Sequence, residues 1–336
     1  MRRQSGRGIP SGGRLAGLTG RVAAVYQSYT ARRLAAAVLV VVGVAIAAFI
    51  LLHVVPGDPA RAVLGEHAPE ASVLALRRQW GLSDSIPHQF VQYLGDLVDG
   101  RLGNSYFYHE SVIALIGQRI GQTAWLVLTA TVFAVLIAVP LAAIAASRRD
   151  RFADHAVRAV GVIGLGMPAF WIGIVLIEIF AVRLKILPVG GWGTTPWEHA
   201  KGLLLPGLTA AFAIVPILVR SLRVGMLDVL ESDFVAAARA KGLGESRVLL
   251  VHVTRNAIIP TLTLLGLNIA FLIGSTVIVE QVFALNGLGS LLLDSITNRD
   301  YPVVQGLTLV LAASVVLITL ATDLLSARLD PRIRLR

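Results

Sequence analysis

The stretch TAWLVLTATVFAVLIAVPLAAIAA, residues 123–146, is 24 residues long and carries no charged side chain. A helix needs about 20 predominantly apolar residues to cross the hydrocarbon core of a bilayer. In lipid, a helix satisfies every backbone polar group within its own segment. The apolar residues here do not alternate with polar ones, as they would in a strand of a membrane barrel. The stretch therefore predicts a transmembrane helix.

Five further stretches resemble it in length and composition, and none contains Lys or Arg. They are residues 34–55, 159–182, 202–219, 257–279 and 301–322. Over the 336 residues, 55% are hydrophobic and only 15% are charged, whereas a soluble domain typically has about 25% charged residues. The expected fold class is an all-α polytopic membrane protein with six transmembrane helices.

Lys and Arg are distributed unevenly between the two sides of these spans. One side holds 21 of them, in residues 1–33, 147–158, 220–256 and 323–336. The other side holds 9, in residues 56–122, 183–201 and 280–300. Because cytoplasmic loops carry an excess of Lys and Arg, the first side is predicted to be cytoplasmic, with both termini inside. We expect a flexible basic tail over 1–33 that can contact anionic lipid, a six-span domain over 34–327 and a C-terminal tail over 328–336.

The sequence contains no recognisable motif of an enzyme active site. It has no Cys, no G-x-x-x-x-G-K-[ST] phosphate loop, no H-E-x-x-H motif and no G-x-S-x-G motif. Its seven histidines show no ligand spacing on one helix, so no metal site is predicted. The net charge of +10 follows the membrane topology rather than forming a nucleic-acid surface. Uphill transport would therefore need energy from a partner or an ion gradient.

Few ionisable side chains lie inside the predicted spans, where they are costly and usually functional. Glu178, Glu280 and Asp323 each lie towards the end of a span, so we interpret them as acids at the membrane interface. Asn268 is the main strongly polar residue deep in a span. A proton-driven carrier is expected to have ionisable groups at depth in several spans, and this pattern disfavours that class.

The polar segment LESDFVAAARAKGLGESRVLLVH, residues 230–252, interrupts the apolar spans. Ser232 or Asp233 suits a helix N-cap, and about two helical turns are predicted over 234–241. Gly242 and Gly244 suit the left-handed end of that helix, and a second helix is predicted from Glu245. The first helix is rich in alanine, and it is too short to be stable alone. We therefore expect another protein to bind it.

Five pieces of sequence resemble the permease subunits of ATP-binding-cassette importers, specifically the first permease of the dipeptide, oligopeptide and nickel transport family. They are LLHVVPGDPA (51–60), GLGMPAFWIG (164–173), RAKGLGESRVLLVHVTRNAIIPTLTLLGLN (239–268), VEQVFALNGLGSLLLDSITNRDYPVVQG (279–306) and DPRIR (330–334). They occur in the family's order and on the matching sides of the spans. Ala236 replaces the Glu that begins the cytoplasmic loop motif elsewhere in this class, and Asn286 replaces the Pro of an expected Pro-Gly-Leu-Gly.

The resemblance implies the type I importer permease fold in a bacterial cell membrane. It implies a complex with a second homologous permease, two cytoplasmic ATPases that bind the ATP and magnesium, and an external solute-binding protein. This chain would have no ATPase site and no cofactor of its own. The implied coupling helix lies within 220–256, and its contacts to the ATPase would be Asp233, Ala236, Ala237, Ala238, Arg239, Lys241, Gly242 and Leu243.

Two other sets of residues are candidates for function. Pro168 can kink the third span, so a gate or pathway is expected at Met167, Pro168, Phe170 and Trp171, together with Asn268. The glycine-rich tip of the outer loop, Asn286, Gly287, Leu288 and Gly289, is expected to contact the binding protein.

The cargo is expected to be a dipeptide or oligopeptide. Nickel and glutathione are open alternatives, because permeases for both share these motifs and five histidines (53, 67, 88, 109 and 199) fall on or near the outer side. Two classes outside the family remain. An ion-gradient carrier or channel would transport without ATP or partners, and a membrane scaffold would merely lay its alanine-rich helix on lipid, for which that helix lacks a large apolar face.

Overall fold

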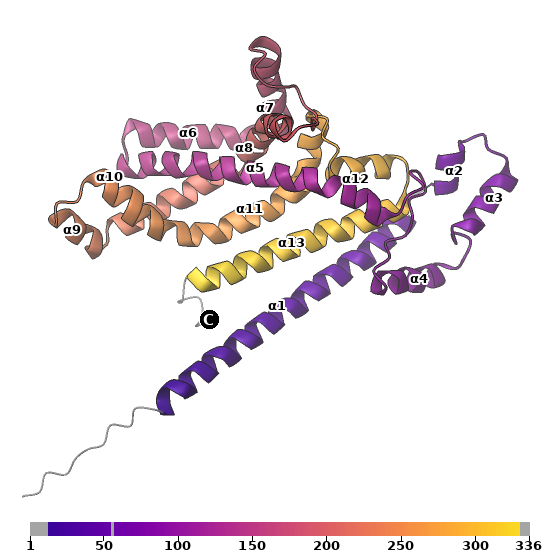
Figure 1. Ribbon diagram of the computed structural model, residues 1–336, viewed down its shortest axis with the longest axis horizontal. Coiled ribbons are helices and arrows are strands. Elements are labelled where there is room, and N and C mark those ends of the chain that lie inside the picture. Colours follow the sequence, from indigo (N-terminus) through magenta and orange to yellow (C-terminus); the bar gives the residue numbers. More distant parts are fainter. Residues whose placement is uncertain (1–12, 55–56, 330–336) are drawn as a thin grey trace, which may run out of the picture.

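The computed structural model describes residues 13–54 and 57–329 of the chain. Its described part consists mainly of helices, the longest of which form an elongated bundle (Figure 1). In chain order the elements are α1 Gly13–Val54, α2 Pro59–Leu64, α3 Glu70–Gln79, α4 Ile86–Val98, α5 Val112–Ser147, α6 Phe152–Gly166, α7 Ala169–Leu176, the π-helix η1 Ile177–Arg183, α8 Pro196–Leu230, α9 Asp233–Ala240, α10 Glu245–Arg247, the π-helix η2 Val248–Val253, α11 Thr254–Val282, α12 Leu288–Thr297 and α13 Tyr301–Leu329.

Five helical stretches in the described part are long and apolar enough to cross a membrane. They are 32–51 within α1, α5, α8, the continuous run from α10 to α11, and 301–326 within α13. Each contains most or all of one predicted span. The third predicted span, 159–182, is divided between α6, α7 and η1.

The third span is broken rather than kinked. Helices α6 and α7 meet at an angle of 105°. Met167 has the extended backbone (φ −90°, ψ 128°) that a following proline imposes on its neighbour, and Pro168 itself is extended, with ψ 136°. Two successive extended residues end α6 and allow the chain to change direction, so the expected single kinked helix over 159–182 is wrong.

Several helices extend beyond the apolar stretches that predicted them. Helix α8 covers Pro196–Leu230 because a capping box of Thr195 and Glu198 begins it well before the apolar stretch 202–219. Helix α1 begins at Gly13, so residues 13–33, expected as a flexible tail, are helical instead. The rest of that tail, 1–12, and the DPRIR ending lie outside the described residues.

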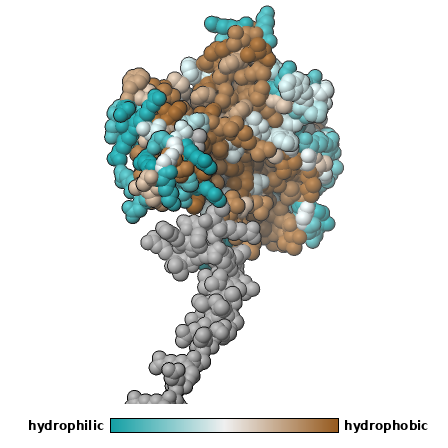
Figure 2. Space-filling view, turned by 60° about the vertical axis from the view of Figure 1, so that its left-hand side comes forward, coloured by the Kyte–Doolittle hydropathy of each residue, from teal (hydrophilic) through white to brown (hydrophobic). Residues whose placement is uncertain are grey.

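Helix α8 is the centre of the bundle, with 72% of its most apolar window buried, against 17% for α1. It packs along α5, whose buried alanines recur at four-residue steps, at Ala130, Ala134, Ala138 and Ala142. Small residues let helices approach closely, which stabilises association in lipid. The lateral surface of the bundle carries a broad hydrophobic band between hydrophilic patches (Figure 2), as expected for a surface that faces lipid or apolar partners.

The two ends of the bundle differ (Figure 1). One end carries α9 and α10, together with the start of α6 and the end of α13. The other end carries α2, α3 and α4. The segments predicted to be cytoplasmic from their Lys and Arg therefore gather at one end, and the predicted outer region 56–122 lies at the other.

Candidate functional site

Helix α9 forms where the polar segment predicts it, over Asp233–Ala240. Ser232 occupies the N-cap position, but its hydroxyl donates to the Val229 carbonyl instead of capping α9. Gly242 has φ +78°, which confirms the left-handed end of the helix. Gly244 has φ −62° and is the N-cap of α10, so its expected left-handed conformation is wrong.

One face of α9 is packed against the bundle and the other is open. Val235 and Ala238 are buried, and Leu243 is half-buried. The remaining predicted coupling residues are exposed: Asp233, Ala236, Ala237, Arg239, Lys241 and Gly242. Phe234 is also exposed, at 46%. Sequence reasoning missed this aromatic side chain, although its position next to buried Val235 places it on the open face.

A salt bridge closes the turn between α9 and α10. The Arg239 guanidinium donates to both carboxylate oxygens of Glu245, with nitrogen–oxygen distances of 3.1 and 2.5 Å. The carboxylate raises the pKa of Arg239. Both side chains are exposed, and exposed pairs contribute only about 0–1 kcal/mol. The pair orders the turn and leaves the open face of α9 accessible.

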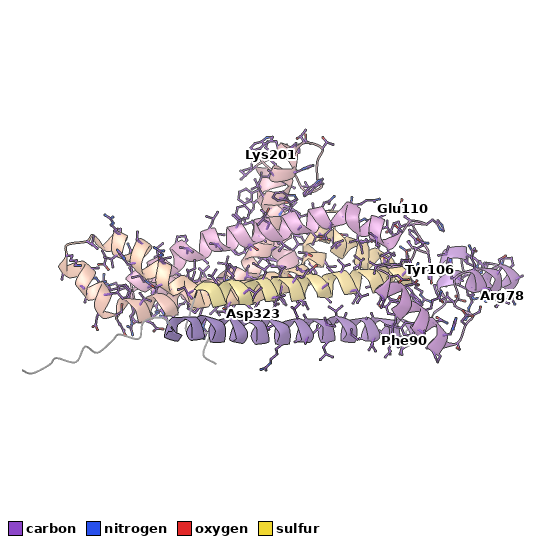
Figure 3. All side chains as sticks on the ribbon, turned by 60° about the horizontal axis from the view of Figure 1, so that its bottom comes forward. Arg78, Phe90, Tyr106, Glu110, Lys201 and Asp323 are labelled. Atoms are coloured by element: carbon purple, nitrogen blue, oxygen red, sulfur yellow. The ribbon has the colours of Figure 1, made fainter. Side chains whose placement is uncertain are left out.

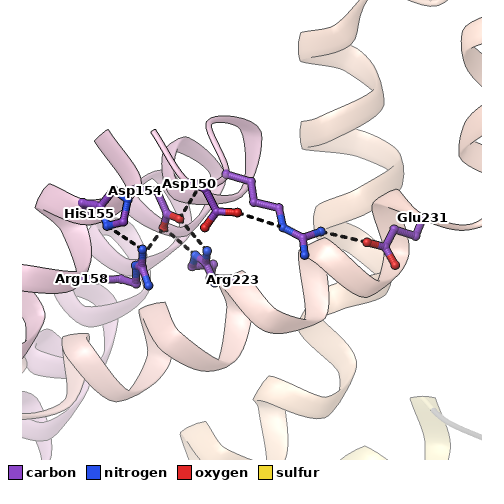
Figure 4. A network of polar contacts seen from close by, with 7 residues as sticks. Asp150, Asp154, His155, Arg158, Arg223 and Glu231 are labelled. Atoms are coloured by element: carbon purple, nitrogen blue, oxygen red, sulfur yellow. Dashed lines mark hydrogen bonds and ion pairs between the residues drawn. The ribbon is translucent and has the colours of Figure 1, made fainter. Parts of the chain in front are cut away.

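A buried ion pair joins α6 to α8 (Figure 4). The carboxylate of Asp154, in the first turn of α6, is fully buried and accepts two hydrogen bonds of 2.6 Å from the guanidinium of Arg223 on α8. It also accepts from the backbone amide of Asp150. Its distance to the Arg158 Nε is 3.5 Å. Sequence reasoning missed this pair, because Asp154 is one of two acids in the predicted basic loop 147–158 and nothing in the sequence distinguishes it from Asp150.

A second, exposed ion pair lies beside the first. Arg149 donates to Glu231, the residue that ends α8, at 2.9 Å. Both side chains are exposed. The short loop between α5 and α6 is thus bonded to the residue immediately before the α9 region.

The residues predicted as a gate lie at the break between α6 and α7. Met167 and Pro168 form the break, and Phe170 and Trp171 follow in the first turn of α7 with 47% exposure each. Asn268 lies on α11, where its amide donates to the Leu264 carbonyl of the same helix.

The predicted contact with a binding protein is not an exposed loop tip. Gly287, Leu288 and Gly289 are buried, and only Asn286 is exposed. The Thr123 hydroxyl accepts from the Leu288 amide at 2.8 Å and donates to Glu280 at 2.7 Å. Three of the four residues are thus covered by the protein's own bundle, which leaves Asn286 alone able to contact a partner.

Two of the three acids expected at the interface behave as expected. Glu178 pairs with Arg183 at the surface, and Asp323 pairs with Arg33 of α1 (Asp323 is labelled in Figure 3). Glu280 is different, because it is 1% exposed and its other oxygen accepts from the Ser290 amide. Its carboxylate holds α12 against α5 and α11, so its expected position at the interface is wrong.

Comparison with known proteins places this arrangement in a family. Residues 138–335 match the family described as binding-protein-dependent transport system inner membrane component. Residues 27–127 match the N-terminal part described for such membrane components. The chain belongs to this family. It is a permease subunit of a binding-protein-dependent ABC importer in a bacterial membrane, as the sequence resemblance implied.

Similar proteins support the assignment over nearly the whole permease. The chain is 38% identical over 307 residues to glutathione transport system permease proteins GsiC, namely those of Escherichia coli strain K12, Escherichia coli O6:H1 and Shigella flexneri serotype 5b. Each match covers 91% of this chain and 99% of the relative. A solved structure of the MetNI methionine ABC transporter, described as inward facing, matches with a TM-score of 0.54 and 16% identity, covering 64% of this chain and 96% of that chain. At that identity the match shows the shared fold.

The outer region of the permease is held by its own polar anchor. Buried Asp300, just before α13, accepts from the Ser105 hydroxyl and from the amides of Tyr106 and Phe107. Tyr106 stacks on Trp80 with ring centroids 3.9 Å apart, and Arg78, Phe90 and Tyr106 lie at this end of the molecule (Figure 3). Burial beside Asp300 raises the pKa of Tyr106. A cavity of about 660 Å³ lies between α4, this segment and the start of α13.

The outer histidines do not form a metal site in the part of the permease that the structure describes. Within residues 13–54 and 57–329, no three His, Asp or Glu side chains come close enough together to hold a metal ion. His53, for example, contacts the Phe49 carbonyl and the Gln89 side chain.

Proposed function

We propose that the permease couples ATP hydrolysis by partner ATPases to the import of small peptides, and that α9 is the helix that docks on an ATPase. The supporting observation is the open face of α9 at the predicted cytoplasmic end. Ala236 and Ala237 let a partner approach the backbone closely, while Arg239 and Lys241 add charge at the rim. Buried Val235 and Ala238 attach the other face to the bundle. A displacement of α9 by the ATPase is therefore transmitted to the membrane spans.

The partners in this proposal are a second homologous permease, two ATPases and an external solute-binding protein. ATP and magnesium bind to the ATPases, and this chain contributes no ATPase site and no cofactor. When ATP closes the ATPase dimer, the coupling helices of the two permeases move together. The permease pair then changes from inward-open to outward-open around the cargo.

Small peptides are the proposed cargo because the relatives that cover nearly the whole chain are named as glutathione permeases, and glutathione is a tripeptide. The cargo test is ATPase stimulation in the assembled complex by a dipeptide, an oligopeptide, glutathione or Ni²⁺, each presented with the binding protein. Stimulation by Ni²⁺ alone would contradict the peptide proposal.

Gly242 offers the sharpest test of docking. A Cβ at this residue meets no atom within 4 Å, so the first atom of a side chain there has room. Any residue other than glycine at φ +78° costs about 1–2 kcal/mol, and Asn tolerates that conformation best. We therefore compare Gly242→Trp with Gly242→Asn as the matched control.

We expect Gly242→Trp to reduce uptake at least tenfold in the assembled complex, with normal membrane insertion, while Gly242→Asn retains most of it. The measurement is uptake of labelled peptide into vesicles together with ATP hydrolysis. Equal uptake by the two variants would show that no partner approaches this surface.

A further inference from the structure

Helix α6 is attached to the bundle in an unusual way. Among its described residues, the one classed as buried is the charged Asp154. Several of its large apolar side chains are exposed instead, including Phe152 at 87% and Val162 at 72%, while Val157 is half-buried against the core. A helix is normally anchored by its apolar face, whereas α6 is anchored by a carboxylate paired with Arg223 of α8.

Further along α6, two glycines face a proline of α8 without side chains that interlock. Cβ atoms added at Gly161 and Gly164 would lie 3.7 Å from the ring of Pro216, which is ordinary van der Waals contact. Glycines facing a proline ring offer no interlocking side chains that would fix the helices against sliding. The bidentate ion pair is therefore the contact that sets how α6 sits along α8, since two parallel N–H···O bonds impose direction as well as distance.

The pair lies between the two moving parts of the proposed mechanism. Arg223 is on the last turns of α8, the helix that leads into α9, and Asp154 is at the start of α6, the helix that ends at the break. The Arg149–Glu231 pair adds an exposed connection at the same end (Figure 4).

We propose that Asp154 and Arg223 are positioning residues for transport, which transmit the movement of α8 and α9 through α6 to the break at Met167–Pro168. This inference rests on the proposed coupling role of α9. With the pair intact, α6 and α8 move together as one rigid unit. With the pair broken, α8 moves without α6, and the break no longer responds to the ATPases.

The test uses the complete complex of this chain, its second permease, the ATPases and the binding protein, reconstituted in vesicles. Asp154→Asn keeps the side-chain shape and removes the charge, and Arg223→Lys keeps the charge and removes the paired donors. We expect uptake per ATP hydrolysed to fall at least tenfold for Asp154→Asn and about threefold for Arg223→Lys. The control is Arg149→Gln, which breaks the exposed pair and should change the ratio less than twofold.

A purely structural role is distinguished by a distance measurement. The chain has no cysteine, so spin labels can be placed on cysteines at exposed Phe152 of α6 and Val224 of α8. In the otherwise unchanged complex, the distance distribution between the labels should be the same with and without ATP. In Asp154→Asn it should shift or broaden when ATP binds. If that variant does not assemble, Arg223→Lys, which retains both charges, takes its place.

Two results would overturn the inference. One is a label distance that already changes with ATP in the unmutated pair, and the other is unaltered uptake per ATP in both variants. A failure of the proposed coupling role has a different signature, namely equal uptake by Gly242→Trp and Gly242→Asn with the label distances still dependent on Asp154.

Discussion

Helices α11 and α13 approach so closely at Gly266 that even a methyl group does not fit. A Cβ at Gly266 would lie 2.1, 2.2 and 2.5 Å from Oγ1, Cγ2 and Cβ of Thr322. To restore ordinary van der Waals contact, the new Cβ and Thr322 must move apart by about 1 Å or more, because real Cβ atoms rarely come within 3.4 Å of a neighbour. Rotation of Thr322 cannot remove the contact with its own Cβ, so the helices themselves must separate.

Gly274, on the same helix, provides the matched control. A Cβ there meets nothing within 4 Å. Replacing a mid-helix glycine with alanine stabilises a helix by roughly 0.5–1 kcal/mol, and this gain is common to Gly266→Ala and Gly274→Ala. Overpacking costs about 1–3 kcal/mol, so Gly266→Ala should be less stable than Gly274→Ala by about that amount.

The assay is the thermal unfolding midpoint of the purified permease in detergent, with both variants prepared alike. We expect Gly274→Ala at or above the unmutated midpoint and Gly266→Ala clearly below it. Adding Thr322→Ala should restore only part of the loss, because it removes the two shortest contacts and leaves the Cβ at 2.5 Å. Equal midpoints for the two glycine variants would refute the close packing of α11 on α13.

Three further outcomes follow from the polar contacts. Glu280→Gln replaces one of the two acceptor oxygens of the carboxylate with an amide donor, so either the Thr123 hydroxyl or the Ser290 amide loses its acceptor. We expect a loss of about 1.5–3 kcal/mol and faster proteolysis within 283–300; unchanged protease resistance would argue against the anchor. Asp300→Ala removes the acceptor of the Ser105 hydroxyl and of the Tyr106 and Phe107 amides, and hydrogen exchange of these two amides should accelerate at least tenfold. Arg239→Gln breaks an exposed pair and should lower stability by less than about 1 kcal/mol, so a large loss in the unfolding midpoint would count against an exposed turn.

Much of the architecture was predictable because lipid imposes a local rule. A segment without water must satisfy its backbone internally, so an uncharged run such as 123–146 indicates a helix without any knowledge of its neighbours. The end of α9 at Gly242 is equally local, since it depends on one residue that tolerates positive φ. The candidate coupling face on α9 follows from the same segment of sequence.

The errors concern residues whose environment depends on distant parts of the chain. Glu280 was expected at the interface, but Thr123 of α5 and the amide of Ser290 surround its carboxylate. Gly287 and Leu288 were expected at a loop tip, but α12 folds back onto the bundle and buries them. Hydropathy along the chain does not reveal such partners.

The sequence by itself determined that this is a helical membrane protein with a short polar helix that ends at a glycine, because length, apolarity and backbone conformation act over a few residues. Only the tertiary structure decided that the third span, 159–182, bends by 105° and that the start of α6 is held to α8 by Asp154 and Arg223. These two residues lie 69 positions apart in the chain, and only close packing of α6 on α8 excludes water from their charges. That exclusion strengthens the attraction between the two charges, so the pair can hold α6 at a fixed position on α8.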